Sequence, residues 1–377
     1  MKKGKKIIMI IIVFAIFAVA IGIRNNSKFN FYSHKYNVKV IKFDNFYEGN
    51  NIKLYYMDGN NDYQKNFKEN HELDKIIQNA GNEIDKSTAL ISWINTMAEF
   101  SINGTMEDGK SGEDILKRLQ SNKTLSSDGY ATILEEALSS VGVYVRKGTL
   151  CTSNDEKPKP RQSYRVIEVW SKSNGKWVMI DPATGCYFTK DNNPLSAVEL
   201  VDTGLSTVEI VNLSEVDKIK YKKEMEKYFN TYTIAIDNNK FTDMESNAYI
   251  TYVRNEESVQ LENQSGYISP MIFVKKKDVF TINPEIERTK IEEDKIPTLI
   301  FSKKDKKEDN DNCIKFTVGA FENSVMLDEY YISLDGDKFY KVKNYYDLSI
   351  TDGQSKIMLS LDGKTPLREV VLQKGGK

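Results

Sequence analysis

Three side chains in the middle of this 377-residue chain could do chemistry: Ser127, Tyr164 and Asp181. Ser127 lies at the predicted N-terminus of a helix, where a serine hydroxyl commonly accepts hydrogen bonds from first-turn amides. Tyr164 begins one predicted strand and Asp181 ends the strand that follows it in a hairpin, so the two are expected to be cross-strand neighbours. We therefore expect a hydroxyl, a phenol and a carboxylate near one end of a sheet.

These groups make a poor catalytic set. A serine hydroxyl needs a base to take its proton, and a phenol with a pKa near 10 is ionised about one time in a thousand at pH 7, a penalty of roughly 4 kcal/mol. The chain has 2 histidines, His34 and His71, and both precede the central helix. In the simpler interpretation, Ser127 caps the helix and Tyr164 donates the hydrogen bond that keeps a buried Asp181 paired.

A helix packed on strands must position these residues. Apolar residues from Tyr130 to Val141 recur at helical spacing, and Gly142 provides the stop. Strands are predicted at 164–170 and 177–181, with Tyr164, Val166, Glu168 and Trp170 on one face. Glu168, Trp170 and Trp177 are interpreted as core and strand-edge residues. Upstream, helical spacing predicts a helix over 72–100 with a break at 85–87, and a short helix over 111–119.

The motifs SSDGYATILEEALSSVGVYVRKG, SYRVIEVW, KWVMIDPATGCYF and PLSAVEL, in this order, resemble the transglutaminase-like superfamily, whose core is papain-like. The resemblance covers roughly residues 73–200 and implies an α+β core of helices packed on an antiparallel sheet. In that family a cysteine at the helix N-terminus is the nucleophile, a histidine is the base and an aspartate orients the histidine. The matching positions here are Ser127, Tyr164 and Asp181, so the resemblance implies a degenerate triad.

The N-terminus predicts the compartment. Four lysines precede an uncharged apolar run over residues 7–23, which is followed by Arg24 and a polar stretch. This pattern predicts a signal anchor with the N-terminus in the cytoplasm and the bulk of the chain extracytoplasmic. The alternative is secretion after cleavage near Ala20.

The remaining chain is predicted to be rich in strands. A hairpin is expected over 38–57, a charged helix with a solvated face over 214–229, and alternating strands thereafter. The last segment resembles an Ig-like or fibronectin-like sandwich. The predicted divisions are a signal anchor at 1–25, a β lead-in at 26–70, the transglutaminase-like domain at 71–213, a helix with a β-rich region at 214–302, a charged loop or linker at 303–312, and the Ig-like sandwich at 313–377.

Charge and cysteine content narrow the function classes. With 53 Lys+Arg against 54 Asp+Glu, the chain has no electrostatic footprint for nucleic acid, and none is expected as a partner. The 3 cysteines, Cys151, Cys186 and Cys313, lack metal-ligand spacing, and no metal or cofactor is expected. Cys151 and Cys186 either pair, if their strands are adjacent, or remain buried free thiols.

Three hypotheses follow. The first is a non-catalytic, membrane-anchored extracytoplasmic protein whose cleft around Ser127, Tyr164 and Asp181 binds a peptide, glycan or protein of the cell envelope. The second is a hydrolase or acyltransferase that uses Ser127 with an unrecognised base. The third is a structural spacer that presents the C-terminal sandwich to a partner.

Overall fold

The computed structural model describes residues 38–102, 104, 110–153, 162–238, 248–261, 268–286, 291–304 and 313–375. The predicted signal anchor, Ala20 and His34 lie outside these residues, as does the charged stretch from residue 305 to 312. Within the described ranges, no helix is both long enough and apolar enough to cross a membrane. The described chain mixes helices and sheets, as the α+β expectation requires.

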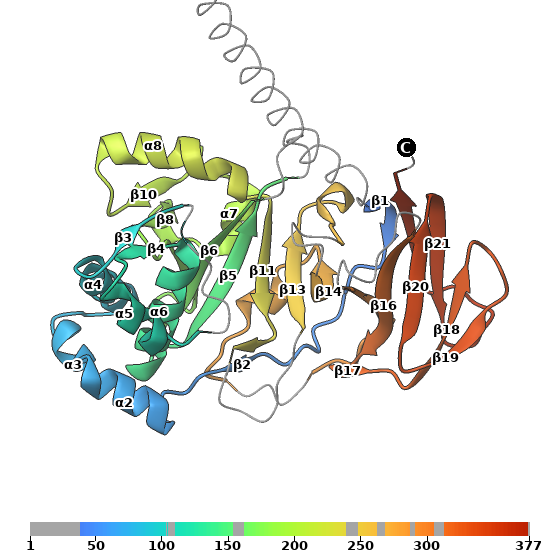
Figure 1. Cartoon of the computed structure of the whole chain (residues 1–377), viewed down its shortest axis with the longest axis horizontal. Helices are drawn as coiled ribbons and strands as arrows, with labels where there is room; N and C mark the ends of the chain where they lie inside the picture. Colours follow the sequence, from blue (N-terminus) through green and yellow to red (C-terminus); the bar gives the residue numbers. More distant parts are fainter. Residues whose placement is uncertain are drawn as a thin grey trace, which may run out of the picture.

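A layer of helices covers one face of a large sheet (Figure 1). The predicted break at 85–87 is wrong, because the helix that contains these residues already begins at Glu83. Its N-cap is Asn82, whose side chain accepts a hydrogen bond from the Asp85 amide. The short helix predicted over 111–119 is confirmed, with Ser111 as its N-cap. The helices of this layer are α2 Asp62–Asn70, α3 Leu73–Ile76, α4 Glu83–Asn95, α5 Gly112–Leu119 and α6 Ser127–Ser140.

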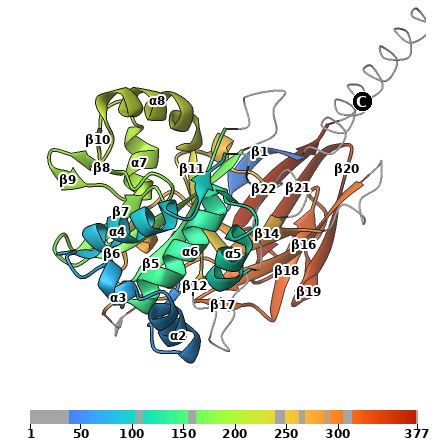
Figure 2. The same ribbon diagram turned by 60° about the vertical axis from the view of Figure 1, so that its left-hand side comes forward.

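Helix α6 is the centre of that layer and lies along the sheet, with α4 and α5 at its sides (Figure 2). The sequence predicts one buried face, yet almost the whole helix is buried. Its polar side is covered because Glu136 accepts hydrogen bonds from the Tyr63 hydroxyl on α2 and the Gly112 amide on α5, each at 2.6 Å. The buried carboxylate therefore holds two other helices against α6.

The large sheet runs through most of the chain in the order β10-β8-β7-β6-β5-β11-β13-β14-β15-β16-β17. The strict alternation predicted for β6 is confirmed: Tyr164 and Val166 face one core, and Ile167 and Val169 face the core under α6. The strands are β5 Val145–Cys151, β6 Ser163–Ser171, β7 Lys176–Ile180, β8 Tyr187–Lys190, β9 Asn193–Pro194 (paired with β8), β10 Glu209–Val211, β11 Thr231–Ala235, β13 Tyr249–Val253, β14 Ile268–Val274, β15 Thr298–Lys303, β16 Cys313–Glu322, β17 Val325–Met326 and β20 Tyr346–Thr351 (paired with β16).

The sheet continues across the predicted domain boundary at 213/214, because β11 pairs with β5 on one side and β13 on the other. The sheet face opposite α6 is covered by helices that follow β6 in the chain. They are α7 Ala197–Thr203, α8 Glu215–Met225 and the short 3-10 turns η1 Glu226–Tyr228 and η3 Asp278–Thr281, with η2 Glu256–Ser258 farther along. The proposed division of the chain into domains stays a prediction.

A second sheet packs on the far end of the first (Figure 1). Its order is β1-β22-β21-β18-β19. Residues 313–375 do not build both layers alone, since β1 comes from the N-terminal side and β14 and β15 lie in the facing layer. The strands of this second sheet are β1 Val38–Asp44, β18 Glu329–Leu334, β19 Tyr340–Lys343, β21 Gly353–Ser360 and β22 Arg368–Lys374.

The hairpin predicted over 38–57 is wrong. β1 pairs with β22 instead, and β2 Tyr55–Tyr56 pairs in parallel with β12 Asp237–Asn238. The physical reason is burial: Phe43, at the end of β1, joins the core between the two sheets, which a free hairpin cannot supply.

Gly148 on β5 is a position where any side chain would collide. An added Cβ would lie 2.1 Å from Cε2 of Tyr232 on the adjacent β11. Gly148→Ala is therefore expected to lower the free energy of unfolding by about 1–3 kcal/mol, the usual effect of overpacking a core. Urea titrations measure this change. Gly375→Ala is the control, because nothing lies within 4 Å of its added Cβ. Equal stability of the two variants would contradict the close approach of Tyr232.

Candidate functional site

Asp181 follows β7 and is fully buried, and its carboxylate is saturated with donors. Oδ1 accepts hydrogen bonds from the amides of Ala183 (2.9 Å) and Thr184 (3.0 Å). Oδ2 accepts from the hydroxyls of Tyr164 (3.0 Å) and Tyr221 (2.8 Å). A carboxylate offers about four lone-pair positions, so these four donors leave no acceptor position for a histidine or a substrate.

The predicted Tyr164–Asp181 hydrogen bond is confirmed. Both groups are buried, and this burial has the larger effect on the pKa of Tyr164. Burial raises the pKa of the Tyr164 phenol well above its usual value, and the Asp181 carboxylate raises it further. Burial and then Asp181 also raise the pKa of Tyr221. Both phenols therefore stay protonated donors at neutral pH, and neither can take a proton from a nucleophile.

Tyr221 is the site residue that sequence reasoning missed. It lies on α8, which the sequence predicts as a charged helix with a solvated face. A signal was present: Tyr221, Met225 and Tyr228 recur at helical spacing, and all three are buried against the sheet. The surrounding lysines and glutamates obscured this narrow apolar stripe.

Ser127 is not the helix cap. The N-cap of α6 is Ser126, whose hydroxyl accepts from the Gly129 amide at 3.3 Å, so the predicted cap is wrong by one residue. Ser127 is the first residue of the helix and is partly exposed, and its Oγ accepts a hydrogen bond of 3.1 Å from the amide of Arg165. The hydroxyl is thus joined to β6, at the residue that follows Tyr164.

One ion pair and two exposed apolar side chains lie on the segments that lead into and contact the start of α6. Arg165 Nε lies 3.2 Å from Asp128 Oδ1. Phe100, in the short strand β3 Glu99–Phe100 that pairs with β4 Thr124–Leu125, is 40% exposed, and its ring centroid lies 6.1 Å from that of Tyr164. Ile102 is 52% exposed. We call Phe100 and Ile102 the apolar rim.

Three further residues named from the sequence are His71, Cys151 and Cys186. His71 Nε2 lies 2.8 Å from Glu113 Oε2, and its ring packs against Phe67 and Trp93, so it takes no part in the site. Cys151 and Cys186 are free thiols, which excludes the disulfide. Among the described residues, no group of three or more His, Cys, Asp or Glu is placed to hold a metal.

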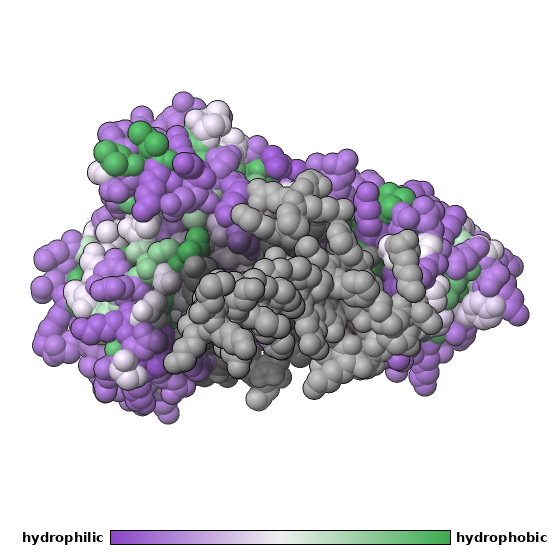
Figure 3. Space-filling model, turned by 45° about the horizontal axis from the view of Figure 1, so that its top comes forward, coloured by the Kyte–Doolittle hydropathy of each residue, from purple (hydrophilic) through white to green (hydrophobic). Residues whose placement is uncertain are grey.

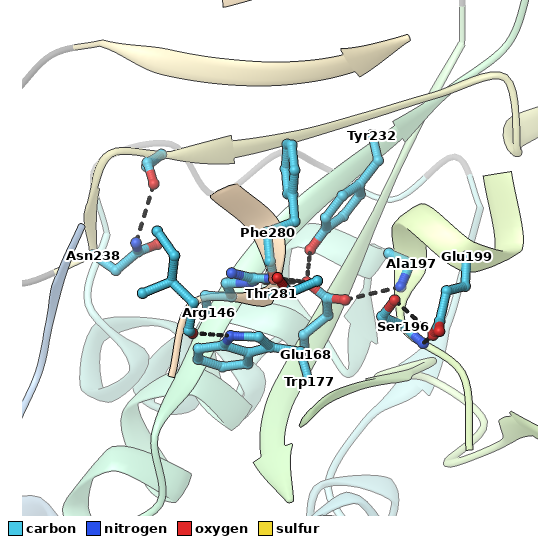
Figure 4. Close-up of polar contacts among 12 residues, drawn as sticks. Arg146, Glu168, Trp177, Ser196, Ala197, Glu199, Tyr232, Asn238, Phe280 and Thr281 are labelled. Carbon is cyan, nitrogen blue, oxygen red and sulfur yellow. Dashed lines mark hydrogen bonds and ion pairs between the residues drawn. The ribbon is translucent and has the colours of Figure 1, made fainter. Parts of the chain in front are cut away.

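A second buried polar cluster lies on the same sheet face as Tyr164 (Figure 4). Arg146 on β5 and Glu168 on β6 are both fully buried, and Arg146 Nη2 lies 2.6 Å from Glu168 Oε2. Tyr232 donates to Glu168 at 2.7 Å, and the Ala197 amide donates at 2.8 Å. The guanidinium stacks 4.1 Å from the Trp177 ring and donates to the Phe280 carbonyl. The cluster therefore joins η3 and α7 to the sheet.

Tyr164→Phe tests the protonated phenol. A phenol whose pKa is higher in the folded than in the unfolded chain gives stability that is complete below the unfolded pKa near 10 and is lost as pH rises above it. Above about pH 10, the unfolding free energy of the variant is therefore expected to fall less steeply with pH than that of the parent, by up to about 1.4 kcal/mol per pH unit. Tyr345→Phe alters a 59% exposed ring and serves as the control. Parallel slopes for Tyr164→Phe and the parent would contradict the assignment.

Comparisons with known proteins give weak likenesses only. No family model matches the chain, and no curated protein matches it. A proposed cysteine protease from Cytophaga hutchinsonii is similar at 12% identity and a TM-score of 0.26, over 43% of this chain and 50% of that one. Red sea bream transglutaminase is similar at 10% identity and a TM-score of 0.30, over 93% of this chain and 64% of that one. The chain thus spans half to just under two thirds of these proteins, and likeness at this level establishes neither a shared active site nor a shared activity.

Proposed function

We propose that this chain is a transglutaminase-like extracytoplasmic protein that does not catalyse, and that its groove binds a peptide, glycan or protein of the cell envelope. The observation that carries the proposal is the saturated Asp181 carboxylate. In the resembled enzymes the matching aspartate holds a histidine, whereas here two phenols and two amides occupy it. The membrane anchor and the Ig-like character of the C-terminal sandwich belong to the same proposal.

The arrangement of Ser127 supports the absence of acyl transfer. A serine nucleophile needs a general base within hydrogen-bond reach, and the neighbouring Tyr164 is held as a donor to Asp181. Cys186 does not replace Ser127 as a nucleophile. Burial, and secondly Asp181, raise the pKa of the Cys186 thiol and keep that thiol protonated.

The apolar rim supports binding. Phe100 and Ile102 are large exposed apolar side chains, and the Phe100 ring lies near the rings of Tyr130 and Tyr164. Exposed aromatic and aliphatic side chains flanked by a guanidinium are a common composition of interaction sites. A ligand that crosses this groove would cover the rim without reaching the buried Asp181.

The test is direct binding of the full chain, in lipid nanodiscs, to a panel of cell-wall peptides and envelope polysaccharides. Phe100→Ser with Ile102→Ser is expected to weaken binding at least tenfold, since interface aromatic residues commonly contribute more than 1 kcal/mol each. Val325→Ser is the matched control, because Val325 is 59% exposed on β17, far from Ser127 in the sheet order. If the double substitution leaves the affinity unchanged, the ligand does not bind at the apolar rim, and the proposed binding groove is contradicted.

The same panel separates the two alternatives. Turnover of an ester or amide that disappears in Ser127→Ala would establish an enzyme in place of a binding protein. A spacer would bind through its C-terminal layers, so that binding would respond to Tyr340→Ser, at a ring 47% exposed on β19, and not to the rim.

A further inference from the structure

Helix α8 has an outer face whose composition differs from that of an ordinary solvated helix. Val216 is 77% exposed and Ile219 is 72% exposed, the two highest values among the large apolar side chains that the structure describes. Figure 3 shows a hydrophobic patch surrounded by hydrophilic surface at the end of the molecule where α8 lies. Isolated exposed apolar residues are common, but these two share one side of a single helix.

Lysines continue that face. Lys220 and Lys223 follow Val216 at spacings of four and seven residues, which places them along the same outward stripe. The acidic residues of the helix lie to the flanks, where Glu215 pairs with Lys218 at 2.8 Å. Together, Val216, Ile219, Lys220 and Lys223 form what we call the outer face of α8.

We propose that the outer face of α8 lies on the surface of an anionic lipid bilayer, the membrane in which the chain is proposed to be anchored. Apolar side chains that enter the boundary between headgroups and acyl chains, flanked by lysines that meet anionic headgroups, are the composition of interfacial helices. A soluble acidic polymer would favour the lysines and leave Val216 and Ile219 without a role.

The position of the outer face of α8 in the molecule is compatible with contact to the bilayer. The described chain enters at Val38, at the start of β1, and both β1 and α8 lie toward the top of Figures 1 and 2, with α8 at the left and β1 farther right. The predicted anchor ends at residue 23, and residues 24–37 extend at most about 50 Å. This tether keeps α8 near the bilayer, so a contact that is weak for a free helix gains from a high effective concentration.

The inner side of the same helix reaches the candidate site. Tyr221 on α8 donates to Asp181, and the ring centroid of Tyr228, which follows in η1, lies 5.7 Å from that of Tyr164. Docking of α8 would therefore fix the groove at a set height and orientation above the membrane. A partner bound there would be held close to the bilayer surface.

Amide hydrogen exchange of the full chain in nanodiscs tests this proposal. Exchange over residues 215–228 is expected to slow at least threefold in nanodiscs containing phosphatidylglycerol compared with phosphatidylcholine alone, and the difference should shrink in high salt. Lys220→Glu with Lys223→Glu should abolish the difference. Lys338→Glu with Lys343→Glu should leave it intact, because Lys338 precedes β19 and Lys343 ends it, at the other end of the molecule in Figure 1.

Equal exchange in both lipids, or protection that survives Lys220→Glu with Lys223→Glu, would overturn the proposal. Protection by soluble polyglutamate but not by anionic nanodiscs would overturn it as well and identify a polymer site. Flotation of the parent chain with vesicles is measured in parallel, because this inference rests on the proposed anchor. Flotation without protection would refute only the docking of α8, whereas failure to float would refute the anchor and the docking together.

Discussion

Replacing Arg146 with methionine is expected to lower the free energy of unfolding by about 3–5 kcal/mol, the usual effect of removing one partner from a buried ion pair. Glu168 would keep the donors Tyr232 and Ala197 but lose its only guanidinium among the described residues, and its charge would remain fully buried. Burial is the largest single influence and would lower the pKa of Arg146, but Glu168 together with Tyr56 and Tyr232 raises it overall. Urea unfolding followed by tryptophan fluorescence measures the loss, since Trp177 stacks on the guanidinium.

Two controls identify the cause of this loss. Arg146→Met combined with Glu168→Leu is expected to be more stable than Arg146→Met alone, because the uncompensated charge is removed with its partner. Lys341→Ala breaks the exposed Lys341–Glu329 pair, which solvent screens, and should leave stability almost unchanged. A loss below about 1 kcal/mol for Arg146→Met would mean that water or another group compensates Glu168.

The Arg146–Glu168 cluster shows which contacts could not be predicted from the sequence. Alternation along β6 correctly places Glu168 on the face of Tyr164, because a strand has a period of two residues. The partners of Glu168 come from β5, β11 and α7, and the period of one strand does not specify which distant elements cover that strand. Glu168 was therefore predicted as a core residue without the buried charge that neutralises it.

The same limit explains the errors in topology. The alternating pattern identified β1 as a strand, but its partner β22 begins at residue 368, more than three hundred residues along the chain. A sequence without an alignment favours the nearest alternating segment as partner. Burial of Phe43 between two sheets decided otherwise. Short-range features, such as the hairpin of β6 and β7 and the stop at Gly142, were predictable because turn chemistry is local.

The candidate site divides in the same way. Tyr164 and Asp181 lie in one hairpin, 17 positions apart in the chain, and their hydrogen bond followed from the register. Tyr221 comes from a helix 40 positions beyond Asp181, and its bond depends on how α8 packs across the sheet. Ser126 and Ser127 are equally good caps by residue type, so composition alone did not choose between them.

Asp181→Ala is expected to lower the free energy of unfolding by about 3–5 kcal/mol, because four buried donors lose a charged acceptor together. The two phenols and the two amides cannot all turn toward other acceptors, since Tyr164 and Tyr221 are held in the aromatic core. Thermal unfolding and urea titration measure the change.

The matched variant is Asp181→Asn, which keeps one acceptor oxygen for the Ala183 and Thr184 amides and should lose clearly less. If Asp181 were an unused relic of an active site, removing it would be neutral or stabilising, as is common where catalytic groups carry strain. A large loss of stability with no loss of any turnover would mean that the carboxylate now holds β7 to α8. That is the outcome expected of a catalytic position whose aspartate has become part of the core.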